Sequence, residues 1–242
     1  MFSKISFRIL SFFLLLILPI YLFGQISNNN DLKQNTEEWF ENNPDSYPHW
    51  LTPEEKLLHV NNSREFYETD PPVGPVINIP EFAPMEGVLI RYPFGISYSV
   101  IAEMSEDIMV TTIVSSTGQQ NNVTNQYSSN GVNLNNCNFL IAPSNSYWTR
   151  DYGPWYIIDG NQDLAIVNFP YNRPRPYDND IPIEMADFLG IGLYGMNVIT
   201  AGGNYMTDGM GISASSTLIF EENPSQSQNQ IRDKIEDYLG VP

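Results

Sequence analysis

The stretch Trp148-Thr149-Arg150-Asp151-Tyr152-Gly153-Pro154 is followed at once by two apolar segments, residues 155–158 and 164–169. Asp159-Gly160-Asn161-Gln162 stands between these segments. An Asp-Gly turn flanked by β-branched and aromatic residues is a strong signal for two paired strands. We therefore expect a β-hairpin directly after the polar motif.

Further strands and helices are expected on both sides of this hairpin. Runs of β-branched and apolar residues predict short strands at 87–92, 108–114, 138–141, 197–200 and 217–220, with a turn at Asp208-Gly209. Apolar residues at helical spacing predict helices at 97–106 and 181–189. The alternation of strands and helices indicates an α/β protein.

A third helix is expected at the C-terminal end of the chain. Asn223 and Pro224 suit its N-cap and first position, and Gly240 suits its end. The apolar residues between them recur on one helical face, namely Ile231, Ile235, Tyr238 and Leu239. A helix of this kind normally leads into another strand, so we expect the chain to be part of a longer one.

The first residues predict a signal peptide. Lys4 and Arg8 form a positive region, an apolar stretch follows at 9–23, and Gly24-Gln25 offers a cleavage point. An uncleaved membrane anchor is the alternative, but the stretch is short for a spanning helix and Pro19 interrupts it. The protein is then secreted and meets a membrane only through its signal peptide. We expect three parts: a signal peptide at 1–24, a pre-domain linker at 25–75 and a domain at 76–242.

Acidic residues dominate the charge of the chain. It has 28 Asp and Glu against 11 Lys and Arg, for a net charge of −17, and loss of Lys4 and Arg8 with the signal peptide would leave 9 basic residues and a charge of −19. Such a protein does not bind nucleic acid, whose phosphates need basic partners. The acidity favours solubility and cationic substrates, and the sequence has no calcium loop of the EF-hand type.

The single cysteine and the two histidines are not arranged for catalysis or metal binding. Cys137 lies in an apolar run without an activating basic neighbour, which favours a half-buried structural thiol. One cysteine cannot form a disulfide within the chain. His49 and His59 have no Cys, Asp or Glu at ligand spacing, so we expect packing or surface roles for them and no metal site.

Trp148 and Asp151 admit two interpretations. One is a buried Trp beside an Asp that caps the turn at Gly153-Pro154. The other is a guanidinium site, in which the carboxylate accepts paired hydrogen bonds and the indole covers the flat face of the ligand. The neighbouring Arg150 favours the ionised form of Asp151, which a guanidinium ligand requires.

The run Asn172-Arg173-Pro174-Arg175-Pro176 places two arginines on a segment whose backbone is restricted by proline. One interpretation is a surface loop with two solvated side chains. The other is a carboxylate clamp, because Arg binds carboxylates through two parallel hydrogen bonds.

These segments resemble the guanidine-modifying deiminases, and within them the bacterial peptidylarginine deiminase and agmatine deiminase group. The resemblance spans roughly residues 80–242 and rests on Trp148–Pro154 and on the segment from Ala201-Gly202-Gly203-Asn204 to Gly211. It implies a pentein-type α/β propeller, of which this chain supplies roughly the first three of five blades. It also implies that Asp151 grips the substrate guanidinium, that Trp148 lines the site, and that Arg173 and Arg175 bind the carboxylate of a C-terminal arginine.

Three functions follow from the resemblance. The leading one is a secreted peptidylarginine deiminase that converts arginine to citrulline and ammonia without an organic cofactor. The second is an agmatine deiminase, but Ala201 stands where relatives that act on small free guanidines often carry Glu. The third is a non-catalytic protein that binds arginine-bearing peptides.

The resemblance also implies elements that this chain lacks. The family's reaction needs a Cys nucleophile and a His-x-Asp element, and both lie C-terminal to the region present. Neither His49 nor His59 is followed by Asp two residues later, and Cys137 is isolated from any activating group. We therefore expect the chain to be the N-terminal part of a deiminase, inactive by itself.

Overall fold

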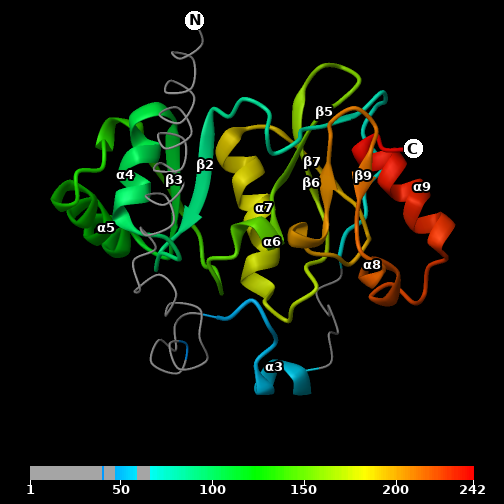
Figure 1. The fold of residues 1–242 in the computed structure, drawn as a ribbon, viewed down its shortest axis with the longest axis horizontal. Coiled ribbons are helices and arrows are strands. Elements are labelled where there is room, and N and C mark those ends of the chain that lie inside the picture. The colour runs from blue at the N-terminus through cyan, green and yellow to red at the C-terminus, as the bar shows by residue number, and fades with distance from the viewer. Residues whose placement is uncertain (1–39, 41–46, 59–65) are drawn as a thin grey trace, which may run out of the picture. The chain divides into compact units, whose positions relative to one another are not determined.

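The computed structural model describes residue 40 and residues 47–58 and 66–242 (Figure 1). The chain divides into two units, Met1–Pro44 and Asp45–Pro242, and the elements discussed below belong to the second. The expected signal peptide at 1–24 and His59 lie outside the described residues. Within the described ranges, no helix combines the length and the apolar character needed to cross a membrane.

A parallel sheet of three strands forms the first half of the domain. Its order is β2 (Gly87–Arg91), β3 (Met109–Val114) and β4 (Cys137–Ile141), and the connections are α4 (Tyr98–Asp107) and α5 (Thr117–Ser129). Ser97 and Ser116 cap the two helices by accepting a backbone hydrogen bond in the first turn. Figure 1 shows the helices side by side next to β3. Their apolar faces bury Ile101 and Val123 against β3.

The second sheet contains the expected hairpin. Its order is β1 (Ile77–Asn78), β5 (Trp155–Ile158), β6 (Leu164–Asn168) and β7 (Gly192–Gly195), with β5 and β6 antiparallel and β6 and β7 parallel. Trp155 lies opposite Val167 in the β5–β6 register. The Asp159 carboxylate closes the turn by accepting the backbone N–H groups of Asn161 and Asp163.

Helix α7 (Pro176–Leu189) connects β6 to β7 and joins the two halves of the domain. Ile181 and Met185 of this helix share one buried cluster with Ile113 and Leu140 of the first sheet and with Ile166 of the second. Figure 1 shows α7 standing between the two sheets. The loops that follow β4 and β6 therefore meet at the N-terminal end of α7, where Asn145 and Tyr177 are hydrogen-bonded.

The other elements are short. They are α3 (Pro53–Leu57), the 3-10 turns η1 (Leu134–Asn136) and η2 (Gly202–Asn204), α6 (Thr149–Tyr152), the strand pair β8 (Met206–Thr207) and β9 (Ser213–Ala214), α8 (Leu218–Glu221) and α9 (Gln228–Leu239). In α9 the expected face buries Ile231, Tyr238 and Leu239, and Gly240 ends the helix in the left-handed conformation with φ 67°.

Three sequence-based assignments are wrong near the C-terminal end. Residues 217–220 are not a strand, because α8 begins at Leu218. Asn223 does not cap α9; its side chain bonds the backbone of Ile199 and Ile219, and Ser227 caps the helix through a capping box. Residues 197–200 contribute only a bridge between Thr200 and Tyr171, and the strand of this region is β7. The bonds from Asn223 to Ile199 are long-range contacts that the local sequence does not encode.

The α/β class is confirmed. The described strands form separate sheets of four, three and two strands, and they do not close into a ring. The number of propeller blades stays a prediction.

Candidate functional site

The polar motif forms a single helical turn, α6, with Trp148 at its N-cap position and Asp151 in its first turn. The N–H of Asp151 donates to the Trp148 carbonyl at 2.8 Å, and the N–H of Gly153 donates to the Thr149 carbonyl at 3.2 Å. Tyr152 is buried and donates its hydroxyl to the Ser146 carbonyl, which fixes the turn from inside. Gly153 has φ 90°, a conformation that favours glycine, and it redirects the chain into β5.

Asp151 is half-buried beside the η2 turn. The backbone N–H of Gly203 donates to its carboxylate. A Cβ atom at position 203 would lie 2.6 Å from Asp151 Oδ1, so only glycine permits this approach. Burial raises the pKa of Asp151 above its usual value; Arg173, the Gly203 N–H, His49 and Arg150 act in the opposite direction, in that order.

The sequence predicts that Arg150 holds Asp151 ionised; in the structure Arg150 does lower the pKa of Asp151, but by less than Arg173, the Gly203 N–H and His49. Arg150 turns away: its Nε pairs with Glu81 at 2.9 Å, and its Nη2 donates to the Tyr205 carbonyl at 2.5 Å. Arg173, which is far from Asp151 in the sequence, has the larger electrostatic effect on its pKa. The charge balance of the site is therefore set by the tertiary fold.

Trp148 is half-buried and borders an aromatic group. Its ring contacts the ring of Tyr147 with centroids 4.9 Å apart, and the ring of His49 at 5.4 Å and 75°. Its Nε1 donates to the Tyr47 carbonyl at 2.8 Å. The aromatic wall that the sequence predicts is thus shared with residues from the segment before the domain.

Arg173 is half-buried and faces the same region. Its Nη1 donates to the carbonyl and to Oδ1 of Asn172, at 3.1 and 2.9 Å, and its Nε and Nη2 donate to the His49 carbonyl at 3.3 and 3.1 Å. Asn172 donates in turn to Glu222 Oε1 at 2.7 Å. Glu222, whose pKa is raised by burial, also belongs to this hydrogen-bond network, and the sequence did not predict it. Nothing in its local sequence indicates the contact.

Arg175 is almost completely buried, with 1% of its surface exposed. Its Nε and Nη2 donate to the two carboxylate oxygens of Glu55 at 2.8 and 3.1 Å, and Nη2 also donates to the carbonyls of Pro48 and Trp50. The guanidinium lies 5.1 Å from the ring centroid of Tyr47. The structure thus places Arg173 near Asp151 and directs Arg175 into residues 47–55. The two-arginine clamp stays a prediction.

Asp178 braces the loop that leads into Trp148. Its carboxylate accepts the N–H groups of Asn145 and Ser146 at 2.7 and 3.0 Å and the Ser146 hydroxyl at 2.7 Å. Burial raises its pKa to about 6, against the lowering effect of these hydrogen bonds. Tyr171 is also buried, and its hydroxyl has no hydrogen-bond partner. Burial is the main cause that raises the pKa of Tyr171, and the negative charge of Asp151 raises it further.

Asp208 forms the expected turn. Its Oδ1 accepts the N–H groups of Met210 and Ile212 at 2.8 and 2.9 Å, and Gly209 and Gly211 have φ of 70° and 99°. These hydrogen bonds lower the pKa of Asp208.

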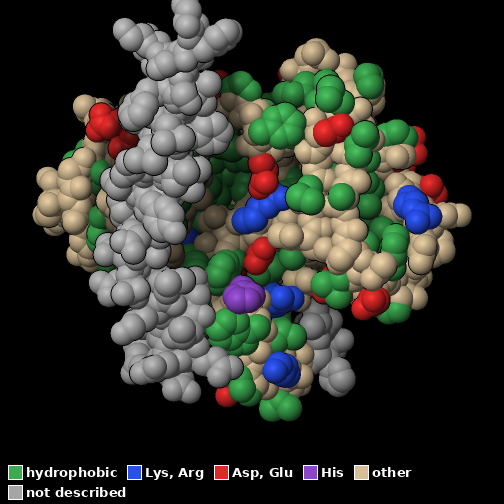
Figure 2. All heavy atoms as spheres, in the orientation of Figure 1, with side chains coloured by type: hydrophobic (Ala, Val, Ile, Leu, Met, Phe, Trp, Pro, Cys, Tyr) green, Lys and Arg blue, Asp and Glu red, His purple; other side chains and the backbone are tan. Residues whose placement is uncertain are grey.

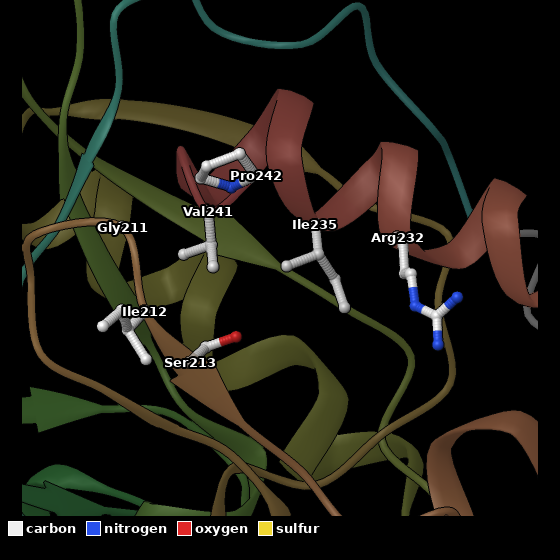
Figure 3. Close-up of a pocket in the computed structure, with 7 residues that line it drawn as sticks. All are labelled: Gly211, Ile212, Ser213, Arg232, Ile235, Val241 and Pro242. Carbon is white, nitrogen blue, oxygen red and sulfur yellow. The ribbon is translucent and has the colours of Figure 1, made fainter.

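A depression of about 360 Å³ lies between this turn and the end of α9 (Figure 3). Figure 3 shows Ile212, Val241 and Ile235 around the space, with the Arg232 guanidinium at one end. None of the predicted site residues lines it. Its lining consists of Gly211, Ile212, Ser213, Arg232, Ile235, Val241 and Pro242.

The remaining predictions concern metals and the thiol. The described residues contain no group of three or more His, Cys, Asp or Glu side chains arranged to hold a metal ion. Cys137 is half-buried as expected; its sulfur contacts the Asn133 carbonyl at 3.4 Å, and burial raises its pKa. Figure 2 shows one face on which acidic and basic side chains lie close together near the middle, among hydrophobic groups.

A family model described as Porphyromonas-type peptidyl-arginine deiminase matches residues 80–242. A Yersinia pseudotuberculosis relative, whose name assigns it provisionally to the agmatine deiminases, is 29% identical over 119 residues, covering 44% of this chain and 33% of the relative. Among solved structures, C. jejuni agmatine deiminase has a TM-score of 0.56 and 22% identity, covering 69% of this chain and 53% of that one. Enterococcus faecalis agmatine deiminase has 0.57 and 20%, covering 67% and 50%. The chain thus spans about a third to a half of these proteins.

Proposed function

This chain belongs to the Porphyromonas-type peptidyl-arginine deiminase family, and from that premise we propose that it forms the guanidinium-binding part of a secreted deiminase acting on C-terminal arginine. The observation that carries the proposal is the half-buried Asp151 carboxylate, held against the Gly203 N–H on the same helical turn as Trp148. A preorganised carboxylate beside an aromatic ring suits a planar cation.

The site is proposed to bind an arginine that carries both charges. The guanidinium would meet Asp151, while Arg173 would meet the α-carboxylate. The lowering effect of Arg173 on the pKa of Asp151 supports this arrangement, because it requires the two groups to be close enough to interact. A cationic and an anionic binding group at opposite ends of one ligand select for its length and orientation.

In the complete reaction, a cysteine thiolate attacks the guanidinium carbon, ammonia leaves, and water hydrolyses the resulting thiouronium to citrulline. Cys137 is not suited to this step, because burial raises its pKa and because it lies at the start of β4 with its sulfur against the Asn133 carbonyl. We assign the nucleophile and the acid/base to a further part of a longer chain, which would complete a five-bladed pentein propeller around the site. The residues present here would bind and orient the substrate.

Agmatine is the main alternative substrate, because the solved relatives carry the name agmatine deiminase. Agmatine has a cationic amine in place of the carboxylate. Arg173 would repel that amine, and Ala201 offers it no acidic partner. These two residues favour the carboxylate-bearing ligand. A non-catalytic role in binding arginine peptides makes the same binding prediction and differs only in turnover.

Calorimetric titration of the chain with glycyl-arginine, glycyl-argininamide and agmatine tests this proposal. We expect glycyl-arginine to bind at least about tenfold more tightly than the other two, since only it satisfies both charged groups. Stronger binding of agmatine would favour the agmatine deiminase alternative. Absence of guanidine binding would refute the site.

Secretion rests on the positive residues Lys4 and Arg8 and the apolar stretch 9–23. N-terminal sequencing of the exported protein is expected to begin at Gln25. An intact N-terminus on a membrane-bound protein would favour the uncleaved anchor instead.

A further inference from the structure

Residues 47–55, which we call the strap, contact the residues expected to bind substrate. Trp148 donates to the Tyr47 carbonyl, Arg173 to the His49 carbonyl, and Arg175 to the Pro48 and Trp50 carbonyls. The sequence places this segment in a linker before the domain. The structure shows that three of the four predicted substrate-binding side chains donate a hydrogen bond to it.

Glu55 holds the strap in place. Glu55 is 4% exposed, and its carboxylate forms a bidentate pair with Arg175, which is itself buried. The carboxylate also accepts the Thr52 N–H at 2.9 Å, and the Glu55 N–H donates to Thr52 Oγ1 at 3.2 Å, so Glu55 completes the capping box of α3, whose N-cap residue is Thr52. Removing one partner of a buried pair leaves an uncompensated charge, which is strongly destabilising.

This arrangement separates the roles of the two arginines. Glu55 already occupies Nε and Nη2 of Arg175, so a substrate carboxylate could form a bidentate pair with these two nitrogens only by displacing Glu55 and leaving its buried carboxylate unpaired. Arg173 is half-buried, and its bonds to the strap go to one neutral carbonyl at 3.1 and 3.3 Å. Arg173 is therefore the arginine that can exchange a strap contact for a substrate carboxylate, and Arg175 is the anchor of the strap.

The strap also supplies an aromatic side chain at the site. The His49 ring is exposed and packs edge-on against Trp148, and His49 contributes to the electrostatic environment of Asp151. The strap's polar bonds go to the tryptophan and the arginines, while Asp151 is paired with Gly203. The strap thus lies beside the carboxylate and borders the position that a guanidinium would take.

We propose that the strap is a fixed wall of the arginine site, and that Glu55 is the positioning residue that locks it there through Arg175. The attachment of the strap through Glu55 and Arg175, which we call the lock, concerns only the fold. The role of the strap as one side of the arginine site, which we call the wall, rests on the proposed function, since it assumes that the ligand is an arginine.

The lock is tested by hydrogen exchange with mass-spectrometric readout on the 242-residue chain. Glu55→Gln should speed exchange in peptides covering 47–58 by at least about tenfold, while peptides from β5 and β6 stay unchanged. Glu54→Gln is the matched control, because Glu54 is exposed on the same helix. Unchanged exchange of the strap in Glu55→Gln would overturn the lock.

A paired substitution guards against a simple folding defect. Glu55→Met with Arg175→Met replaces the buried ion pair by apolar side chains of similar length, a change that is often tolerated. If Arg175 is an anchor, the double variant should dock the strap again and keep its preference for glycyl-arginine over glycyl-argininamide. Loss of that preference with a docked strap would show that Arg175 binds the substrate and would overturn the proposal.

The wall is tested by ligand binding and kinetics. Opening the strap with Glu55→Gln should weaken glycyl-arginine binding by roughly tenfold and, in the full-length protein, raise KM with kcat largely retained. Restoration of KM in the double Met variant is expected as well. Tighter binding after opening would show that the strap is a plug and would refute the wall. If the unmodified chain binds no guanidine, the proposed function and the wall both fail, whereas the exchange result still decides the lock.

Discussion

Arg175 and Glu55 are 120 positions apart in the sequence, yet their side chains form a buried pair with hydrogen bonds of 2.8 and 3.1 Å. This pair connects the segment before the domain to the loop that precedes α7. It gives the two arginines of the Arg-Pro-Arg run different surroundings, one anchored on a carboxylate of its own chain and one half-buried beside Asp151. Arg173 and Arg175 are equivalent in the local sequence, and Glu55, a distant residue, makes their surroundings different.

Asp151→Asn should abolish most guanidinium binding. The neutral amide cannot accept two charge-assisted hydrogen bonds, and loss of such a partner costs roughly 2–5 kcal/mol, or about 30-fold to several thousandfold in affinity or in kcat/KM of the full-length protein. Calorimetry with glycyl-arginine measures the effect. Asp208→Asn, at the exposed turn, is the control and should bind normally. If the affinity of Asp151→Asn for glycyl-arginine stays within threefold of that of the unmodified chain, Asp151 has only a structural role in the turn.

Guanidinium binding should be lost on acidification earlier than an ordinary aspartate would predict. Burial raises the pKa of Asp151 above 3.8, so its carboxyl takes up a proton at a higher pH than an exposed one. The ionised form binds the cation; affinity should therefore fall by about tenfold per pH unit once the pH drops below that raised pKa.

Ethylguanidine is a suitable probe for this titration because it carries no carboxylate of its own. Its dissociation constant is measured from pH 7.5 downward. A pH-independent affinity down to pH 4 would contradict the assignment of Asp151 as the ligand.

Asp178 should make the domain less stable as the pH rises. Its pKa is about 6 in the folded protein, above that of an unfolded aspartate, so its stabilising contribution is complete below about 3.8 and is lost as the pH passes about 6. Between pH 4 and pH 7 the unfolding free energy should fall by roughly 1–3 kcal/mol relative to Asp178→Asn. Urea unfolding of both proteins across this range gives the difference. A difference independent of pH would refute the prediction.

Arg173→Ala should remove the preference for a free carboxylate. Binding of glycyl-arginine should weaken while binding of glycyl-argininamide stays nearly unchanged, since the amide offers no charge to Arg173. In the full-length protein the corresponding discrimination in kcat/KM is expected to be about 30- to 1000-fold before the substitution and small after it. Arg232→Ala, whose guanidinium lies over Phe220, is the control for a general charge effect. Equal loss with both ligands would exclude a carboxylate role.

Local sequence patterns determined several parts of this protein. The Asp-Gly turn and its apolar flanks predicted the β5–β6 hairpin, and the glycines after Asp208 predicted the turn between β8 and β9. The apolar spacing in α9 predicted the buried face of that helix. Each of these turn and spacing patterns lies within a single helix or hairpin. For Trp148 and Asp151 the residue pattern alone left two interpretations open, and the guanidinium site stays a prediction that comes from the family resemblance.

The tertiary structure alone decided the rest. The local sequence predicts Asn223 as a helix cap, but its side chain bonds the N–H and the carbonyl of Ile199 instead. These backbone groups need hydrogen-bond partners when they are buried. Glu222 meets Asn172, and Glu55 meets Arg175, across separations that no local spacing encodes. The pKa values of Asp151 and Asp178 also depend on the tertiary structure. Both are raised mainly by burial, and the fold determines which segments bury each carboxyl group.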